Sequence, residues 1–292
     1  MRTSDLLSRF RIERPARFRL AARDCAETCG FDMSKEEAKA ALKGDIERLA
    51  QLQERLYAHD RWAVLAIFQG MDAAGKDSAI KHVMSGINPQ GCEVTAFKAP
   101  SAEELDHDFL WRHAVRLPTR GRIGIFNRSY YEEVLVVRVH PELLAKQRLP
   151  DSLGRAGLWT RRFADICGFE RHLANNGTRV VKFFLHVSKD EQRKRFLERL
   201  DDPDKRWKFN PGDISERRLW NRYMAAYEDM IRYTSSPEAP WYVVPADDKW
   251  FARMIIAAAL ARTLEDLRPQ FPQVGPATLK AMRKARNALA SE

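Results

Sequence analysis

The feature that most constrains this chain is an apolar run that leads directly into a glycine-rich turn. Residues 64–68 read Val-Leu-Ala-Ile-Phe, as expected of a strand that is covered on both faces of a parallel sheet. Gly70, Gly75 and Lys76 follow in the spacing Gly-x-x-x-x-Gly-Lys, ahead of a helix-compatible stretch. This order predicts a phosphate-binding loop in an α/β fold. A glycine turn with only a structural role is the alternative.

The loop has the groups that phosphate recognition needs. Its backbone N–H groups can point at phosphate oxygens, while the helix dipole and the Lys76 ammonium add positive charge. Asp77 stands where the common motif has a Ser or Thr that holds magnesium, and Asp72 lies within the loop. Lys98, just past the second expected strand, is a further candidate, against an ordinary surface lysine. The predicted phosphate-binding residues are Gly70, Ala73, Ala74, Gly75, Lys76, Asp77, Ser78 and Lys98.

The net charge of the chain limits the classes of partner that it is expected to bind. The 292 residues carry a formal net charge of +10, which suits nucleic acid, an anionic membrane surface or a polyanionic substrate, or else reflects a generally basic surface. No apolar run approaches 18 residues, so we expect no membrane span. The four cysteines lack zinc-site spacing, and a reducing, cytoplasmic setting is the simplest fit.

Strand and helix patterns alternate along the chain, which predicts a parallel sheet with helices on both faces. Ligands of such sheets bind beyond the carboxyl ends of the strands. We expect an irregular, charged arm over residues 1–34, a core over 35–267 and a basic tail over 268–292. The expected strands cover residues 62–69, 92–97, 122–126, 178–187 and 241–245. The expected helices cover residues 36–59, 76–86, 102–117, 151–175, 189–200, 213–233 and 249–267.

Polar residues follow the third expected strand. Many phosphate-loop enzymes have a metal-ordering Asp at this point, whereas this chain has the neutral Asn127. Glu132 and Glu133 come shortly afterwards. A turn followed by a surface helix would also explain the glutamates, which favour helix N-termini. Because the segment should lie beside the phosphate loop, we interpret it as part of the site, with Asp72 and Glu132 able to hold magnesium.

A charged segment follows the fourth expected strand. Residues 189–208 contain eight basic and six acidic side chains, so a solvated face of ion pairs is one explanation. Small-molecule kinases with a phosphate loop carry a mobile, arginine-rich lid at this position, and arginine binds phosphate bidentately. Pro203, Pro211 and Gly212 then predict a loop. We interpret residues 189–213 as a lid.

Three segments in the right order resemble the polyphosphate kinase 2 family. They are residues 70–78 (Gly-Met-Asp-Ala-Ala-Gly-Lys-Asp-Ser), residues 126–135 (Phe-Asn-Arg-Ser-Tyr-Tyr-Glu-Glu-Val-Leu) and residues 207–213 (Trp-Lys-Phe-Asn-Pro-Gly-Asp). The resemblance spans about residues 35–265. It implies a thymidylate-kinase-like P-loop kinase fold in three layers, with a five-stranded parallel sheet and a helical lid. It also implies phosphoryl transfer between inorganic polyphosphate and a nucleotide such as AMP, ADP or ATP.

The resemblance assigns roles by position. It implies catalytic roles for Asp72, Lys76, Arg128, Arg193 and Arg206, and magnesium, with manganese as an alternative, at Asp72, Asn127 and Glu132. Family members with Asp in place of Asn127, and Asn in place of Glu132, tend to act on nucleoside diphosphates. The pattern in this chain resembles the subgroup that accepts both AMP and ADP. The resemblance further implies a homo-oligomer, either a dimer or a tetramer.

The sequence leaves two alternative functions open. One is a nucleotide or nucleoside kinase that uses ATP, and the other is a P-loop NTPase that acts with nucleic acid. The chain shows no RNA-reading motif and no platform of interleaved aromatic and basic residues. We therefore expect polyphosphate rather than nucleic acid to be the polyanionic partner.

Overall fold

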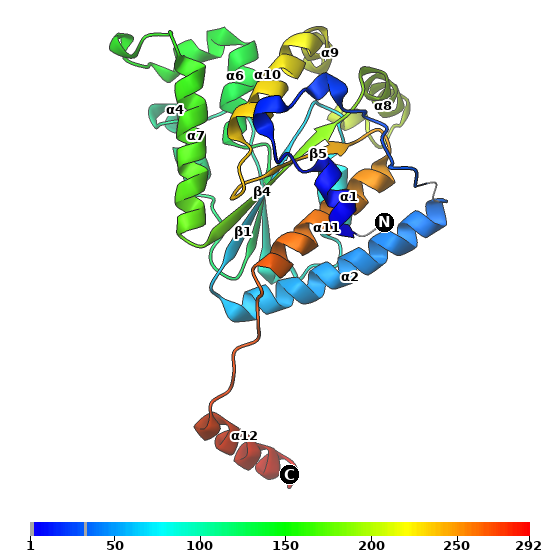
Figure 1. Ribbon diagram of the computed structural model, residues 1–292, viewed down its shortest axis with the longest axis vertical. Helices are drawn as coiled ribbons and strands as arrows, with labels where there is room; N and C mark the ends of the chain where they lie inside the picture. Colours follow the sequence, from blue (N-terminus) through cyan, green and yellow to red (C-terminus); the bar gives the residue numbers. More distant parts are fainter. Residues whose placement is uncertain (1–2, 32–33) are drawn as a thin grey trace.

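A five-stranded, all-parallel sheet with strand order β2-β3-β1-β4-β5 lies at the centre of the molecule. The computed structural model describes residues 3–31 and 34–292. The strands are β1 (Ala63–Gln69), β2 (Cys92–Ala96), β3 (Ile123–Asn127), β4 (Thr178–His186) and β5 (Trp241–Pro245). α7 (Leu158–Asn175) lies on one side of the sheet, and α2 (Lys35–His59) and α11 (Lys249–Asp266) lie on the other (Figure 1). The predicted fold class is confirmed.

The central strand, β1, accounts for the apolar run at residues 64–68. All seven residues of β1 are buried, and its register pairs Val64 with Ile123 on β3 and with Arg179 on β4. Burial on both faces removes the alternation of polar and apolar residues that an exposed strand would show. β1 therefore delivers the loop that follows it to the middle of the sheet's carboxyl edge.

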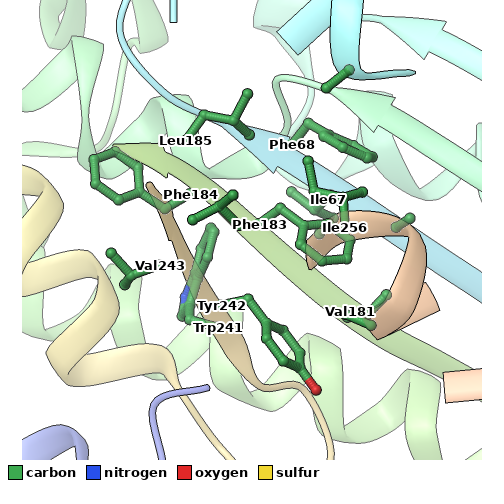
Figure 2. Packing of buried hydrophobic residues seen from close by; sticks show 14 of the residues in the cluster. Ile67, Phe68, Val181, Phe183, Phe184, Leu185, Trp241, Tyr242, Val243 and Ile256 are labelled. Atoms are coloured by element: carbon green, nitrogen blue, oxygen red, sulfur yellow. The ribbon is translucent and has the colours of Figure 1, made fainter. Parts of the chain in front are cut away.

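Large side chains fill the layers on both faces of the sheet. On the face towards α11, Phe68 of β1 and Phe183 of β4 have ring centroids 5.1 Å apart. On the opposite face, Trp241 at the start of β5 is fully buried, and its Nε1 donates to Thr234 Oγ1 at 2.9 Å. Figure 2 shows these residues with Ile256 of α11 beside the same sheet. Burial of such aromatic and aliphatic side chains stabilises each by about 1.5–3 kcal/mol, so the site is mounted on a rigid support.

The helix start predicted before residue 36 is confirmed by its capping contacts. Ser34 Oγ accepts from the backbone N–H of Glu37 at 3.2 Å, and Glu37 Oε2 accepts from the backbone N–H of Ser34 at 2.9 Å. α2 then runs to His59, and Asp60 ends it with a φ of 50°. Leu49 and Leu56 of this helix are fully buried, and α2 packs along α11.

The remaining helices differ from expectation where turns interrupt them. The stretch predicted as one helix over 102–117 is two short helices, and the stretch over 213–233 is broken at Leu219. The other bounds are α3 (Lys76–Val83), α4 (Ala102–Asp106), α5 (Trp111–Ala114), α6 (Val136–Val139), α8 (Lys189–Asp201), α9 (Gly212–Arg218), α10 (Trp220–Thr234) and α12 (Pro276–Leu289).

The N-terminal segment is ordered, which corrects the expectation of an irregular arm. It contains α1 (Thr3–Phe10) and two 3₁₀ turns, Pro15–Arg17 and Leu20–Ala22. Leu7 and Phe10 are buried, and the backbone N–H of Ile12 donates to Trp241 O at 2.9 Å on the edge strand β5. The segment thus covers an edge that would otherwise expose unpaired backbone groups. Residues 1–2 and 32–33 of the predicted arm lie outside the described residues.

The helices that the structure describes do not meet the requirements of a membrane span. Over residues 3–31 and 34–292, none combines the length and the apolar character that a membrane crossing requires.

Candidate active site

The loop between β1 and α3 depends on glycine at two positions. A Cβ on Gly70 would lie 2.9 Å from Leu185 O, so only glycine allows the loop to pass this close to β4. Gly75 has a φ of 101° at the start of α3, a conformation that L residues rarely adopt. Ala73 has a φ of 60°. The backbone therefore curls as a phosphate-binding loop does.

Lys76 folds back over this loop. It is 8% exposed, and its Nζ donates to Gly70 O at 2.6 Å and to Met71 O at 3.1 Å. Burial lowers the pKa of Lys76, and Arg128 lowers it further, whereas Asp72 opposes the shift. The ammonium thus has backbone partners but lies in a site that favours a nearby anion.

Arg195 holds the loop from behind, a role that sequence reasoning missed. One guanidinium nitrogen donates to Ala73 O at 3.1 Å and to Ala74 O at 3.0 Å, and the other donates to Ala246 O at 2.5 Å and to Asp247 O at 3.0 Å. Only the contact with Glu191, four residues earlier on α8, had a sequence signal. The planar fork ties the phosphate loop to the residues after β5.

Arg128 and Asp72 join the loop to the end of β3. Arg128 Nη2 donates to Asp72 Oδ1 at 2.6 Å, and its backbone N–H donates to Phe68 O at 3.0 Å. Burial lowers the pKa of Arg128, but Glu132 and Asp72 outweigh burial and raise its pKa overall. The result is a permanent cation at the carboxyl edge of the sheet.

Polar contacts also connect the other residues predicted near β3. Asn127 Nδ2 donates to Asp77 Oδ1 at 2.5 Å, which explains why the loop position after Lys76 accepts an Asp. Burial raises the pKa of Glu132, while Arg128 opposes this. With its amide oriented as the hydrogen bonds require, Gln69 donates to Glu132 Oε1 at 2.9 Å.

A cavity of about 780 Å³ opens over the phosphate loop. We call it the basic cavity, because nine of its lining residues are basic and four are acidic. Its basic residues are Lys76, Lys98, Arg128, Arg195, Arg199, Lys205, Lys208, Lys249 and Arg253. The acidic ones are Asp72, Asp77, Glu198 and Asp213. This surplus of cations suits a ligand with several negative charges.

The predicted phosphate-binding residues fall into two groups, those that line the basic cavity and those that do not. Those that line the basic cavity are Ala73, Gly75, Lys76, Asp77, Ser78 and Lys98. Gly70 and Ala74 are absent from the lining and shape the turn instead. Ser78 Oγ accepts from Arg253 at 2.9 Å, so its hydroxyl is directed to the cavity wall.

The two arginines predicted in the lid do not line the basic cavity. Arg193 is exposed and lies 3.5 Å from Asp190, and Arg206 Nε donates to Leu200 O at 2.8 Å. The lid residues that do line it include Arg199, Lys205 and Lys208. For Arg193 the phase of α8 decides this, and sequence charge alone could not separate Arg193 from Arg199.

A second cavity, of about 290 Å³, lies beside the first. We call it the aromatic cavity. Its apolar and aromatic lining includes Phe97, Leu105, Phe109, His113, Tyr130, Val136, Val137 and Leu143. The two cavities share Phe97, Lys98, Ala99 and Arg128. A ligand in one cavity can therefore meet a ligand in the other beside Arg128.

His113 is a neutral part of the aromatic wall. Burial, reinforced by Arg112, lowers the pKa of His113 to about 3. Its Nδ1 lies 3.1 Å from Phe109 O, so Nδ1 carries the proton and Nε2 can accept. The ring lies 4.3 Å from that of Phe97, between centroids. The aromatic cavity thus resembles a slot for a flat ligand with an apolar face, and charged lining residues such as Glu104 and Arg112 can meet polar groups at the ligand's edge.

The acidic residues suit a magnesium ion that also binds phosphate. Among the described residues, no three His, Cys, Asp or Glu side chains cluster as a ready-made metal site. Asp72 and Asn127 nevertheless bring hard oxygen atoms to the basic cavity. Magnesium commonly takes one or two carboxylates and fills its other positions with phosphate oxygens and water. Glu132 lines the aromatic cavity instead.

Comparisons with known proteins agree with this geometry. The model of the family described as "Polyphosphate kinase 2 (PPK2)" matches residues 32–272. The chain is 55% identical to an ADP-polyphosphate phosphotransferase of Rhodopseudomonas palustris, over 89% of this chain and 90% of that protein. It is 46% identical to an AMP/ADP-polyphosphate phosphotransferase of Meiothermus ruber, over 94% and 98% of the two chains.

A solved structure shares the fold. The crystal structure of polyphosphate kinase 2 from Arthrobacter aurescens aligns with a TM-score of 0.86 at 40% identity, over 98% of this chain and 97% of that one. The P-loop kinase fold implied by the sequence is therefore confirmed. Together with the family match and the two relatives, this likeness leads to one conclusion: the chain belongs to the polyphosphate kinase 2 family.

Proposed function

We propose that this protein is a polyphosphate-dependent nucleotide kinase, which transfers phosphoryl groups from inorganic polyphosphate to ADP and to AMP. The observation that carries the proposal is the pair of adjoining cavities, one basic and one aromatic, which share Arg128. Membership of the polyphosphate kinase 2 family and the names of the relatives support the same reaction.

The two cavities differ in the ligand that each suits. The basic cavity has the larger volume and an excess of cations, which suits a chain of phosphates whose binding depends on charge. The smaller aromatic cavity offers flat apolar walls, which suit a nucleobase. We place polyphosphate in the first and the nucleotide in the second, with the nucleotide's terminal phosphate beside Arg128.

The proposed reaction needs alignment and charge more than covalent chemistry. An oxygen of the nucleotide's terminal phosphate attacks the terminal phosphorus of polyphosphate. A new P–O bond forms, and the bond to the next phosphate breaks, so a polyphosphate shorter by one unit leaves. Lys76, Arg128 and the loop N–H groups lie where they can stabilise the negative charge of the transferring group.

Magnesium, or manganese, would neutralise phosphate charge when bound. We assign it to Asp72, which lines the basic cavity beside the phosphate loop, because the Asp77 carboxylate already accepts from Asn127. The ion pair of Asp72 with Arg128 positions the carboxylate. The assignments of Asn127 and Glu132 as metal ligands stay predictions, as does assembly into a homo-oligomer.

A transfer assay without ATP tests the function. Incubation with ADP, polyphosphate and magnesium should yield ATP, and Lys76→Ala protein is the control for contaminating kinases. An ATP-dependent nucleotide kinase would make no ATP from this mixture. A P-loop NTPase would release inorganic phosphate from ATP without forming ATP from ADP. Either outcome would remove the proposal.

Acceptance of AMP is the finer part of the proposal. It rests on Glu132, by resemblance to the dual-substrate subgroup, and on the name of the Meiothermus ruber relative. With polyphosphate as donor, AMP should yield ADP and then ATP. Turnover of ADP without turnover of AMP would remove this part and leave the polyphosphate kinase activity standing.

A further inference from the structure

The C-terminal helix α12 stands apart from the rest of the protein. Figure 1 shows it beyond an extended segment that leaves α11, at the opposite end of the molecule from α8 and α9. Every residue from 276 to 292 is exposed. The family model ends at residue 272, so α12 lies outside the part of the chain that this match covers.

The charge of this segment is one-sided. Residues 268–291 contain no Asp or Glu, and their basic residues are Arg268, Lys280, Arg283, Lys284 and Arg286. Lys280, Arg283 and Lys284 have the spacing i, i+3, i+4, which places them on one face of the helix. We call this the basic face of α12. The opposite side carries apolar residues, Met282, Ala285 and Leu289.

The basic face differs in its surroundings from the basic side chains of α8. On α8, acidic neighbours partner the basic side chains, as Asp190 does for Arg193 and Glu191 for Lys194. Within residues 3–31 and 34–292, no ion pair involves a side chain of α12. Like charges at i, i+3 and i, i+4 destabilise a helix, and an isolated helix of this length is marginal in water. An anion that bridges these side chains would relieve the repulsion.

We propose that α12 is a second binding element for inorganic polyphosphate, which holds a part of a long chain remote from the part in the basic cavity. This inference rests on the proposed function. A partner with one repeated negative charge complements a face that carries only positive charge. Because α12 lies far from α8 and α9 (Figure 1), only a long chain can occupy both places at once. Two linked contacts raise the effective concentration of the chain at the cavity.

The test compares long and short donors. The variant Lys280→Gln/Arg283→Gln/Lys284→Gln removes the basic face. The matched control, Lys39→Gln/Lys43→Gln/Arg55→Gln, removes three exposed charges from α2. For chains of about several hundred phosphates, the α12 variant should raise the polyphosphate KM by about fivefold or more, because one linked contact is lost. For chains of about six phosphates, its KM and kcat should stay within about twofold of wild type.

Three results would overturn the inference. The first is an unchanged KM for long chains, and the second is an equal rise for long and short chains or in the α2 control. The third is a loss of oligomer mass in the α12 variant, measured by analytical ultracentrifugation, which would assign α12 to a contact between copies of the chain. Failure of the proposed function looks different, since wild-type protein would then form no ATP from ADP with either donor.

Discussion

At the scale of single residues, the phosphate loop shows how a short pattern becomes a site. The glycines follow from backbone geometry, because Gly70 passes close to Leu185 and Gly75 has a positive φ. The pattern could not show that Lys76 donates to the carbonyls of its own loop. A bound phosphate chain would compete with these carbonyls for the ammonium. Substitution of Lys76 is therefore the most direct test of the phosphate loop.

Lys76→Ala should abolish almost all phosphoryl transfer while the protein remains folded. The lost interaction acts on charge that develops during transfer, and such groups contribute about 2.7–4 kcal/mol, or about a hundredfold or more in kcat. Rates with ADP and polyphosphate, and far-UV circular dichroism for the fold, check this. A variant that keeps more than about a tenth of the wild-type rate would contradict it.

Asp72→Asn should lose activity and require more magnesium, because it removes the carboxylate assigned to the metal and the ion pair with Arg128. A magnesium titration of the transfer rate measures this. If the midpoint of the titration matches that of wild type, Asp72 serves only to position Arg128.

His113 should make the folded protein sensitive to mild acid. Its pKa is lowered to about 3 by burial, whereas the unfolded chain has a value near 6.5. Below about pH 6.5 the unfolded state therefore binds a proton that the folded state does not, so the free energy of unfolding falls as the pH falls. From pH 7 to pH 5 this group should account for a loss of about 2 kcal/mol.

His113→Asn provides the comparison for that loss. Urea unfolding at both pH values should show a smaller decrease for the variant than for wild type. His186 is also buried with a lowered pKa, so the variant should keep part of the dependence. An equal decrease in the two proteins would show that His113 does not titrate in this way.

At the scale of elements, the lid is held together by its own contacts. Arg199 of α8 donates to Asp213 of α9 at 3.1 Å and to Lys208 O at 3.3 Å. Trp207, which is 76% exposed, also lines the basic cavity. We expect this segment to close over bound phosphates as a unit, with Arg199 and Lys208 closest to the chain.

Single substitutions in the lid distinguish cavity-lining residues from exposed ones. Arg199→Ala and Lys208→Ala should each raise the polyphosphate KM or lower kcat by about tenfold, because each loses a charge near the bound chain. Arg193→Ala and Arg206→Ala are matched controls from the same lid and should stay within about twofold, as exposed charges usually do. Steady-state kinetics measure all four. Larger losses in the controls would mean that the closed lid uses the residues first predicted from sequence.

Sequence patterns predicted the elements that have a local signal. The buried strand β1, the capping box at Ser34 and the phosphate loop each depend on residues within a few positions of one another. The break at Leu219 between α9 and α10 was missed, because no Gly or Pro marks it in the sequence. The order of the N-terminal segment was also missed, because its buried apolar residues are interspersed with arginines. Arg195 was missed as a loop support because its partners lie as many as 122 positions away.

At the scale of the whole molecule, the parallel sheet brings both cavities to one edge. β1 carries the phosphate loop, and β3 ends in Asn127, directly before Arg128. These strands are neighbours in the sheet, so Arg128 reaches Asp72 although the two residues are 56 positions apart in sequence. The central claim is therefore that polyphosphate and nucleotide bind side by side and meet at Arg128.

Equilibrium binding of ADP in the presence of polyphosphate tests that claim most directly. Lys76→Ala protein should be used, because its transfer is slow. As the concentration of short-chain polyphosphate rises, the apparent Kd for ADP should change by no more than a few-fold and then reach a plateau, since both ligands bind at once and only repel each other across Arg128. An apparent Kd that keeps rising in proportion to polyphosphate would mean that the two ligands compete for one cavity, and would contradict the account.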